Sequence, residues 1–517
     1  MNVRKKAIRN TLFSSVGIYT EYLLGMLTSI FIARHLGPED FGAYSAVIWM
    51  VAMGVAMTNS GTASAVIKFV AELRGAGKED QIAITIAYLR RAQRWFLLAV
   101  LVIGGLLMYF AGNRITPGFN HVMMFGFLVI AVSLRAQYMF NVGIAKGFED
   151  FRATAIVASI ATPINLGLVV LAWWVDAEVE ALLVVFLISS ALFYGVSQML
   201  TSRMIPPPGK DVVLPPTLLS RVRRHMRLVA VTVTVGFLAA SEVEVFFLNM
   251  FGTADAAGMF KVAYQLAVGA AMLVPGVVGA LLLPMMANAL SQGRDVAGQR
   301  FVASTSYLAM LAAPLVAFGA VFSAPIIALL YGAQYAAAAP VFAVCLFACS
   351  LATVTQGGSS LLVSADRQLT ILIMVVSLGL LKILLDIVLI RAHGLNGAVL
   401  AYLVVAIINA AAVTILALRA IGLHPDWARL LRITMAAALA ALAALPLRGH
   451  WPALPTLLVG GVVIAMLYAF LTLLLRCWSS NDIEHLQQLL QRYTRGRPAA
   501  LMQLLEWSGR KTTRQVQ

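Results

Sequence analysis

Eight charged side chains in this sequence lie inside long apolar segments or at their ends, where they could bind a charged ligand. They are the basic residues Lys68, Arg135, Lys261 and Lys382 and the acidic residues Glu21, Glu242, Glu244 and Asp386. An ionised side chain at the centre of a bilayer costs at least about 2.5–3.5 kcal/mol. Such residues therefore face a cavity, a ligand or a partner of opposite charge, and they are the first candidates for function.

The four basic residues belong to different apolar segments, and this distribution suits an anionic ligand. A phosphate or diphosphate group in a shared cavity would offset the cost of burying several positive charges. We therefore assign Lys68, Arg135, Lys261 and Lys382 as candidate substrate-binding residues. Pairing with buried carboxylates is the alternative, because Lys382 and Asp386 have the i, i+4 spacing of an ion pair on one helix.

The acidic residues suggest a second role, since a buried carboxylate can hold a proton or a coupling cation. Glu21, Glu242, Glu244 and Asp386 are the candidates for ion coupling or gating, with pairing to the buried basic groups as the alternative. The sequence has no P-loop, nucleotide-binding turn, metal-ligand cluster or nucleophile elbow. We therefore expect no catalytic residue, no resident metal and no cofactor, and a protein that is not an enzyme.

Long apolar segments must position these charges, and the composition places the segments in a membrane. The 517 residues are 61% hydrophobic and 12% charged, whereas about a quarter of an average soluble domain is charged. Segments of about 20 apolar residues can each cross the hydrocarbon core. The pattern predicts an all-α polytopic protein with about 14 transmembrane helices, at residues 11–35, 41–66, 95–112, 122–145, 152–175, 180–202, 226–250, 255–289, 301–323, 337–364, 368–390, 395–418, 429–447 and 453–475.

The basic residues between the segments predict the orientation of the chain. Most of the 38 Lys and Arg residues fall in alternate connections, starting with the N-terminal residues, as the positive-inside rule requires. We therefore expect a bacterial inner-membrane protein with both termini on the cytoplasmic side. The same bias accounts for the net charge of +16 without any nucleic-acid partner.

An internal repeat and a proline-rich connection predict two lobes. Residues Phe31 to Gly54 align without a gap on Phe246 to Gly269, and each copy has a glycine-containing turn between two helices. The predicted domains are an N-terminal lobe at 1–204, a basic linker at 205–224 and a C-terminal lobe at 225–419. Two further helices at 420–476 and a tail at 477–517 follow. The two six-helix lobes would face one another as pseudo-symmetric halves around a central cavity.

The tail has the pattern of an interfacial helix. Ile483, Leu486, Leu489 and Leu490 share one helical face, and basic residues follow at Arg492, Arg495 and Arg497. An amphipathic helix of this kind binds anionic membrane lipid. A solvated cytoplasmic tail is the alternative.

The opening of the chain resembles the polysaccharide-transporter family of the multidrug/oligosaccharidyl-lipid/polysaccharide exporter superfamily. The resemblance rests on NTLFSSVGIYTEYLLGMLTSIFIARHLGPEDFGAYSAVIWM, followed by SGTASAVIKFVAEL, with the turn LGPEDFGAYS at Leu36 to Ser45 as its most specific part. The second copy, FGTADAAGMFKVAYQL, is similar to the same pattern. The resemblance covers most of the chain to about Arg419. It implies two six-helix lobes around a cationic cavity, alternating access and an undecaprenyl-diphosphate-linked oligosaccharide as cargo.

We therefore expect a flippase of lipid-linked repeat units for exopolysaccharide, O-antigen or capsule assembly. Its partners would be the lipid-linked oligosaccharide and the polymerase and glycosyltransferases of the same pathway. A lipid II flippase is an alternative, although that branch has arginines in its first helix where this chain has Glu21. A cation-coupled multidrug exporter could use Glu21, Glu242 or Asp386. A membrane glycan polymerase or ligase is expected to have a long outer loop that this sequence lacks.

Overall fold

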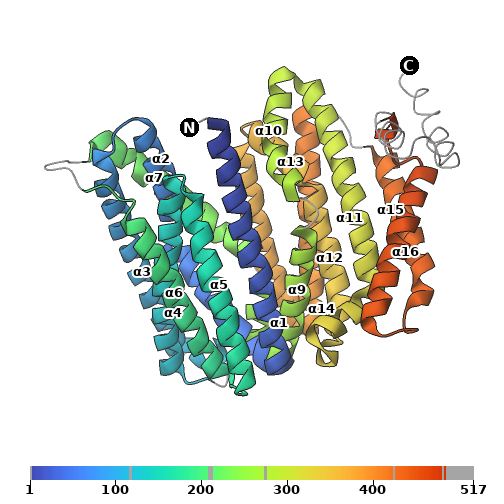
Figure 1. Cartoon of the computed structure of the whole chain (residues 1–517), viewed down its shortest axis with the longest axis horizontal. Coiled ribbons are helices and arrows are strands. Elements are labelled where there is room, and N and C mark those ends of the chain that lie inside the picture. Colours follow the sequence, from blue (N-terminus) through green and yellow to red (C-terminus); the bar gives the residue numbers. More distant parts are fainter. Residues whose placement is uncertain are drawn as a thin grey trace. The chain divides into compact units, whose positions relative to one another are not determined.

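The computed structural model describes residues 3–115, 119–207, 214–240, 242–272, 276–422, 426–479 and 482–484, which form helices and short connections without a β-strand (Figure 1). Ten of the described helices are long and apolar enough to cross a membrane. The all-α membrane fold predicted from the sequence is thereby confirmed. The predicted tail helix lies almost entirely outside the described residues, which end at residue 484.

The difference between about 14 predicted segments and ten long helices has a simple local cause. Helix α14 (Gln368–Ile421) contains two predicted segments, and α1 (Val3–Thr58) contains the first segment and most of the second, whose end at residue 66 falls in the next helix. They bend at Gly37 and Gly394, whose φ values of 76° and 54° suit glycine. Conversely, the predicted segments 226–250 and 255–289 are each divided into two shorter helices.

Five further helices complete the first part of the chain. Helix α2 (Thr62–Gly75) follows the turn at Gly61, and α3 (Asp80–Ile115), α4 (His121–Gly147), α5 (Phe151–Trp174) and α6 (Val179–Ser202) follow in order. The side chains of Asn120 and Asp150 accept hydrogen bonds from backbone N–H groups at the starts of α4 and α5. Added Cβ atoms at Gly143 and Gly147 would lie 3.2 and 3.0 Å from atoms of α2, so these glycines let α4 pack closely against α2.

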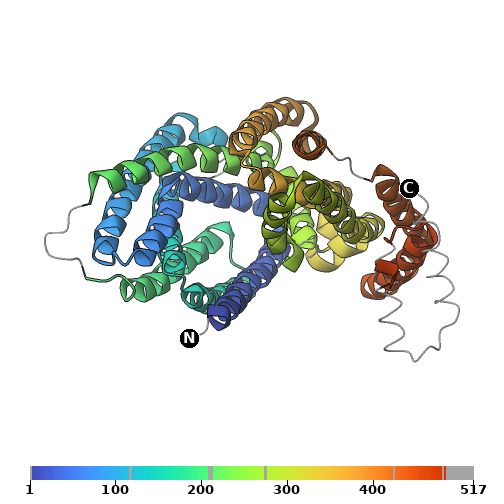
Figure 2. The same cartoon turned by 90° about the horizontal axis from the view of Figure 1, so that it is seen from above.

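Most helices in the middle of the chain are short. Helix α7 (Pro216–Ala240) begins inside the predicted linker, with proline in its first turn. It is followed by α8 (Val243–Phe251), α9 (Ala254–Met272) and α10 (Gly276–Gln292). Pro284 lies within α10. Figure 2 shows α7 lengthwise along one edge of its part of the molecule.

The remaining helices are α11 (Arg294–Tyr331), α12 (Ala338–Val354), α13 (Gln356–Ser364), α14, α15 (Trp427–Ala444) and α16 (Ala453–Leu474). Helices α11, α15 and α16 share a core of small and aromatic side chains, among them Phe322, Ala440 and Tyr468. The apolar residues of this core explain why the last two predicted segments form a helical pair on α11.

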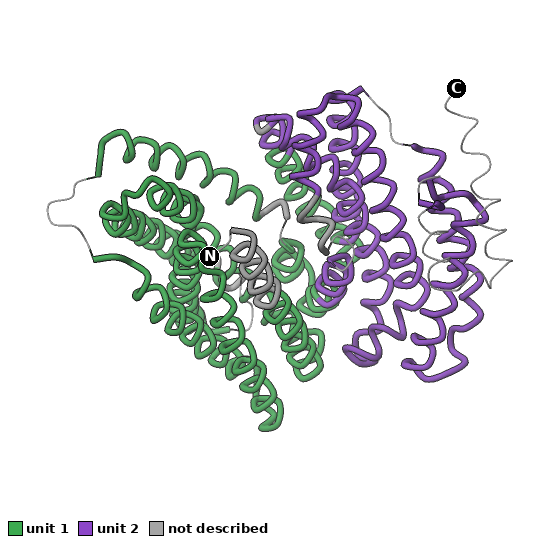
Figure 3. The backbone as a smooth tube through the Cα atoms, turned by 45° about the horizontal axis from the view of Figure 1, so that its top comes forward, with its two compact units in different colours: residues 1–261, 375–398 green, residues 262–374, 399–517 purple. Residues whose placement is uncertain are grey.

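Internal contacts divide the chain into two compact units (Figure 3). Unit 1 comprises residues 1–261 and 375–398, and unit 2 comprises residues 262–374 and 399–517. The first half of α14 therefore belongs to unit 1, although most of its sequence neighbours belong to unit 2. The lobes predicted at 1–204 and 225–419 stay a prediction.

The two copies of the internal repeat meet inside unit 1. An added Cβ at Gly42 would lie 1.8 Å from the Ala254 carbonyl oxygen, and one at Gly258 would lie 2.0 Å from that of Pro38. The Asn249 side-chain amide donates a hydrogen bond of 3.0 Å to the Gly42 carbonyl. Only glycine permits this approach of two backbones. The contact places both glycine-containing turns at the same end of unit 1, as the parallel repeat requires.

Candidate functional site

The most deeply buried charges lie where α8 packs beside the first half of α14, within unit 1. The Lys382 ammonium is 3.1 Å from the Glu244 carboxylate, and the two side chains are 2% and 0% exposed. Asp386 is also fully buried, and its carboxylate oxygens have no hydrogen-bond partner among the described residues. The i, i+4 pair expected between Lys382 and Asp386 is thus replaced by a pair between two helices.

A second ion pair lies at the start of the same short helix. The Lys261 ammonium on α9 donates a hydrogen bond to the carboxylate of Glu242, which precedes the first residue of α8. Pairing within the protein, the alternative considered for Lys261, is therefore what the structure shows. Because Glu242 and Glu244 are close enough to interact, the two pairs form one group of charges.

This group contains three carboxyl groups and two ammonium groups, so one carboxyl group lacks a positive partner. Asp386 is that group, because Glu242 and Glu244 pair with the two lysines. Burial without a partner favours the uncharged form of a carboxyl group. Among the described residues, Asp386 is thus the buried carboxyl group of this cluster that belongs to neither ion pair.

Arg135 on α4 is held differently, by aromatic rings and a hydroxyl. Its guanidinium carbon is 4.9 Å from the ring centre of Phe186 and 4.6 Å from that of Phe193, both on α6. Its Nε donates a hydrogen bond of 3.0 Å to the Ser190 hydroxyl. Rings and hydroxyl orient the guanidinium but do not neutralise it.

No carboxylate among the described residues lies within ion-pair distance of Arg135. Glu21 on α1 acts on it electrostatically from farther away, and the Glu21 side chain is exposed. Of the four basic candidates, Arg135 combines partial burial with an uncompensated charge. Lys68 is an exposed residue of α2 whose ammonium lies 5.4 Å from the ring centre of Phe69.

Sequence reasoning did not identify the residues that orient Arg135. Phe186, Ser190 and Phe193 are i−4, i and i+3 residues of one face of α6, and nothing in an apolar helix marks such a face. The pairing of Glu244 with Lys382 was equally hidden, because it depends on α8 meeting α14. The sequence signal for this charge cluster was the spacing of Glu242 and Glu244, because it places two carboxylates at the start of one helix.

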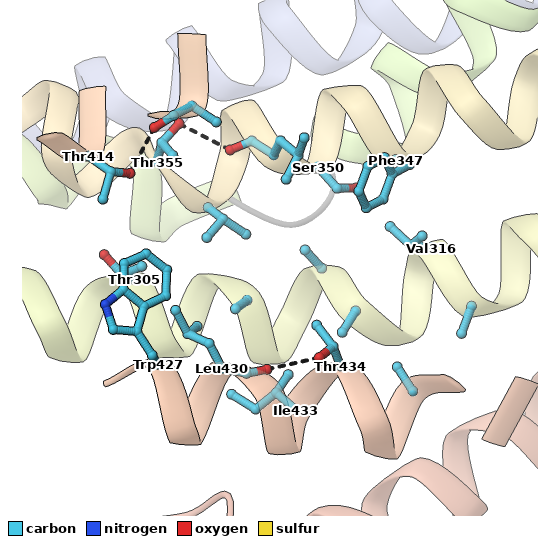
Figure 4. A pocket seen from close by; sticks show the side chains of 18 of the residues that line it. Thr305, Val316, Phe347, Ser350, Thr355, Thr414, Trp427, Leu430, Ile433 and Thr434 are labelled. Atoms are coloured by element: carbon cyan, nitrogen blue, oxygen red, sulfur yellow. Dashed lines mark hydrogen bonds between the residues drawn. The ribbon is translucent and has the colours of Figure 1, made fainter. Parts of the chain in front are cut away.

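Unit 2 contains a groove of about 780 Å³ with a different character (Figure 4). Helices α11, α12, α14 and α15 form its walls, and alanines such as Ala309, Ala313 and Ala437 leave the space open. Thr355, Thr414 and Thr434 line it too. Their hydroxyls donate to carbonyls of their own helices, which turns apolar atoms toward the groove.

Comparison with known proteins places the chain in a family. Residues 7–290 match the family model described as polysaccharide biosynthesis protein. The chain belongs to this family. A comparison with curated protein sequences finds no match.

Solved transporters share the fold of this polysaccharide biosynthesis protein. One similar structure is the lipid II flippase MurJ in an inward closed conformation, with a TM-score of 0.71 and 13% sequence identity. The match covers 89% of this chain and 98% of that one. Another is an inward-facing multidrug resistance MATE family transporter of the MOP superfamily, with a TM-score of 0.60 and 15% identity. That match covers 80% of this chain and 98% of the transporter.

The chain is thus a member of a polysaccharide biosynthesis family that shares its fold with solved transporters, and ten of its described helices are long and apolar enough to cross a membrane. The predicted resemblance is thereby confirmed. Its site chemistry consists of an uncompensated guanidinium, a closed group of buried charges and an apolar groove.

Proposed function

We propose that this protein is a flippase for undecaprenyl-diphosphate-linked oligosaccharide repeat units, which it moves across the bacterial inner membrane by alternating access. The polymers served would be exopolysaccharide, O-antigen or capsule. In this proposal the protein is a transporter and not an enzyme, both termini are cytoplasmic, and glycosyltransferases and a polymerase act before and after it.

The observation that carries the proposal is the charge on Arg135. A partly buried guanidinium without a carboxylate partner is stabilised when a ligand supplies the negative charge. Its planar N–H groups match the oxygens of a phosphate, and Ser190 takes up only the Nε donor. A diphosphate that links sugar to lipid is an anion of the required kind.

The groove of unit 2 supports the lipid part of the proposed cargo. Its lining of alanine, leucine, phenylalanine and turned-in threonine methyl groups suits a flexible hydrocarbon chain. A polyprenyl chain in this groove would keep its lipid environment while the sugar crosses.

Transport by the purified protein in liposomes tests the proposal. We expect it to move a fluorescent lipid-linked oligosaccharide between leaflets, measured by accessibility to a membrane-impermeant quencher. Arg135→Ala should slow transport by about 10- to 100-fold, the loss of one charged hydrogen-bonding group, and Arg135→Lys should recover part of the rate. Arg391→Ala is the matched control, because Arg391 also contacts an aromatic ring, Phe251, but is not a site residue. Equal rates for Arg135→Ala and the unchanged protein would refute the role of Arg135.

Filling the groove tests the lipid part separately. Ala313→Trp places a large ring in the groove, whereas Leu439→Trp places the same ring on an exposed position of α15. We expect the first substitution to slow transport of the polyprenyl-linked substrate and the second to leave it unchanged. If both variants transport normally, the lipid chain does not use the groove.

A cation-coupled multidrug exporter is the second candidate, and the unpartnered Asp386 favours it. A proton that binds and leaves this carboxyl group could drive export of a cationic compound. Cells that make the protein would then resist cationic dyes, and Asp386→Asn would remove the resistance. A deletion strain separates the candidates, because the flippase proposal predicts loss of surface polysaccharide while lipid-linked repeat units still form.

A further inference from the structure

Helix α7 has two contrasting faces along its first half. Leu218, Val222 and Met226 follow one another at intervals of four and are buried in the core that α7 shares with α2, α3 and α4. The remaining faces carry the four arginines Arg221, Arg223, Arg224 and Arg227, and α7 contains no acidic residue. The helix is thus fixed to unit 1 by its apolar face and presents positive charge elsewhere.

The protein itself uses two of the four arginines. Arg221 forms a bidentate ion pair with Glu72 of α2, with nitrogen–oxygen distances of 2.7 and 2.9 Å. Arg223 donates a hydrogen bond of 3.2 Å to the Tyr88 hydroxyl of α3. Arg224 and Arg227 are exposed, and the described part of the chain offers neither of them an ion pair or a hydrogen bond.

The exposed arginines of α7 stand directly beside exposed apolar side chains. Leu228 and Val231, at i+4 and i+7 from Arg224, are 61% and 55% exposed. They lie on the same helical face as Arg224, so this face changes from charged to apolar side chains within about one turn. Helix α7 is not among the ten described helices that are long and apolar enough to cross a membrane, and charged and apolar side chains that adjoin in this way are typical of a helix at the level of the lipid headgroups.

Helix α3 repeats the boundary next to α7. Arg91, Arg94 and Trp95 are exposed, and the apolar residues Leu98 and Val102 follow on the same side, 51% and 53% exposed. Tryptophan and arginine are the residues that gather at the level of the headgroups. The hydrogen bond between Arg223 and Tyr88 ties the two helices together just before their boundaries.

We propose that the exposed face of α7 with Arg224 and Arg227, together with Arg91 and Arg94 of α3, is a binding surface for anionic phospholipid headgroups. Four exposed guanidinium groups without an acidic neighbour on either stripe complement phosphate diesters. The apolar stripe that continues from each pair of arginines gives the acyl chains of the same lipid a surface to contact. A soluble anion would not contact these apolar residues, so they favour a lipid. The proposal does not depend on the identity of the cargo.

Lipid binding by the full-length protein in a non-ionic detergent tests this surface. Native mass spectrometry would compare the apparent affinity for phosphatidylglycerol with that for phosphatidylcholine. We expect the unchanged protein to prefer phosphatidylglycerol, and Arg224→Gln/Arg227→Gln to lower that affinity at least about threefold without changing binding of phosphatidylcholine. Arg224→Lys/Arg227→Lys should retain the preference because the charges remain.

The paired arginines provide the matched control. Arg221→Gln should lower the thermal stability, since it breaks the ion pair with Glu72, and leave the preference for phosphatidylglycerol unchanged. The proposal is overturned if Arg224→Gln/Arg227→Gln binds phosphatidylglycerol like the unchanged protein. Displacement of the lipid by inorganic diphosphate would also overturn it, because the surface would then recognise a free anion. Should the double variant not fold, Arg227→Gln alone gives the same comparison.

Discussion

Unit 1 buries Glu244, Lys382 and Asp386 among its helices, whereas no charged side chain is buried among the described residues of unit 2. Unit 2 instead has the alanine-lined groove between α11, α12, α14 and α15. Both units consist of helices, so the secondary structure does not explain the difference, which lies in the side chains. The comparison shows that one chain can keep buried charge and an apolar groove in separate units.

The contrast also concerns what holds each unit together. In unit 1, ion pairs and a glycine contact join helices that are far apart in the sequence, such as α8 with α14. In unit 2, helices α11, α15 and α16 pack through apolar side chains and through the hydrogen bond from Tyr468 to the Met310 carbonyl. Substitutions should therefore destabilise the two units through different interactions.

The largest expected effect is the loss of the buried ion pair of unit 1. Lys382→Met leaves Glu244 buried without its partner and should lower the free energy of unfolding by about 3–5 kcal/mol. The double variant Lys382→Met/Glu244→Gln should recover most of this loss. Unfolding of the purified protein in detergent, followed by circular dichroism, measures both values. Leu380→Met, on an exposed position of the same helix, is the control. A loss below about 1 kcal/mol for Lys382→Met would show that the pair is not sealed from water.

The next effect concerns the contact between the two repeat copies. Gly258→Ala places a Cβ 2.0 Å from the Pro38 carbonyl oxygen, so the backbones must separate at a cost of about 1–3 kcal/mol. Gly167→Ala has no atom within 4 Å of the added Cβ and should stabilise its helix by about 0.5–1 kcal/mol. The same unfolding measurement would give opposite signs for the two variants. Equal signs would contradict the close approach.

A smaller effect is expected in unit 2, where hydrogen bonds and packing replace charge. Tyr468→Phe removes the donor of the 2.8 Å hydrogen bond to Met310 and should lower the free energy of unfolding by about 1 kcal/mol. Tyr109→Phe, at an 83% exposed position, should change nothing measurable. A loss for Tyr468→Phe as large as that for Lys382→Met would remove the distinction between the units.

The smallest effect is a pH dependence at the surface of unit 1. The hydrogen-bonded Arg221 guanidinium lowers the pKa of Glu72 below its ordinary value of 4.5. A carboxyl group with a lowered pKa in the folded state adds stability above its ordinary pKa and loses that addition as the pH falls through the lowered value. Thermal unfolding of the unchanged protein and of Arg221→Gln should therefore differ at neutral pH and converge below pH 4.5. A difference that persists there would assign the effect of Arg221 to packing.

Much of this architecture follows from the sequence, because apolar length and glycine-containing turns are local signals. The helix ends predicted at residues 175, 202 and 475 lie within one residue of the observed ends, which are Trp174, Ser202 and Leu474. The repeat was visible for the same reason, since both copies place a turn at corresponding positions, Gly37 and Gly252.

The candidate site could be predicted only in part. The cost of charge in a membrane singled out Arg135, Lys382 and Asp386. Which charge pairs with which depends on contacts between helices that are distant in the sequence, and so the partnership of Lys382 with Glu244 was missed. The groove was missed because alanines that leave a space have the same sequence pattern as alanines that fill a close contact.

The glycine contact in unit 1 has a consequence that concerns assembly. Gly42 meets Ala254, and Gly258 meets Pro38, so each repeat copy offers nearly the same patch that it receives. Reciprocity of this kind defines the interface of a two-fold homodimer, in which residue i meets j and j meets i. Within this one chain, the two repeat copies therefore meet in the way that the two subunits of a two-fold homodimer meet.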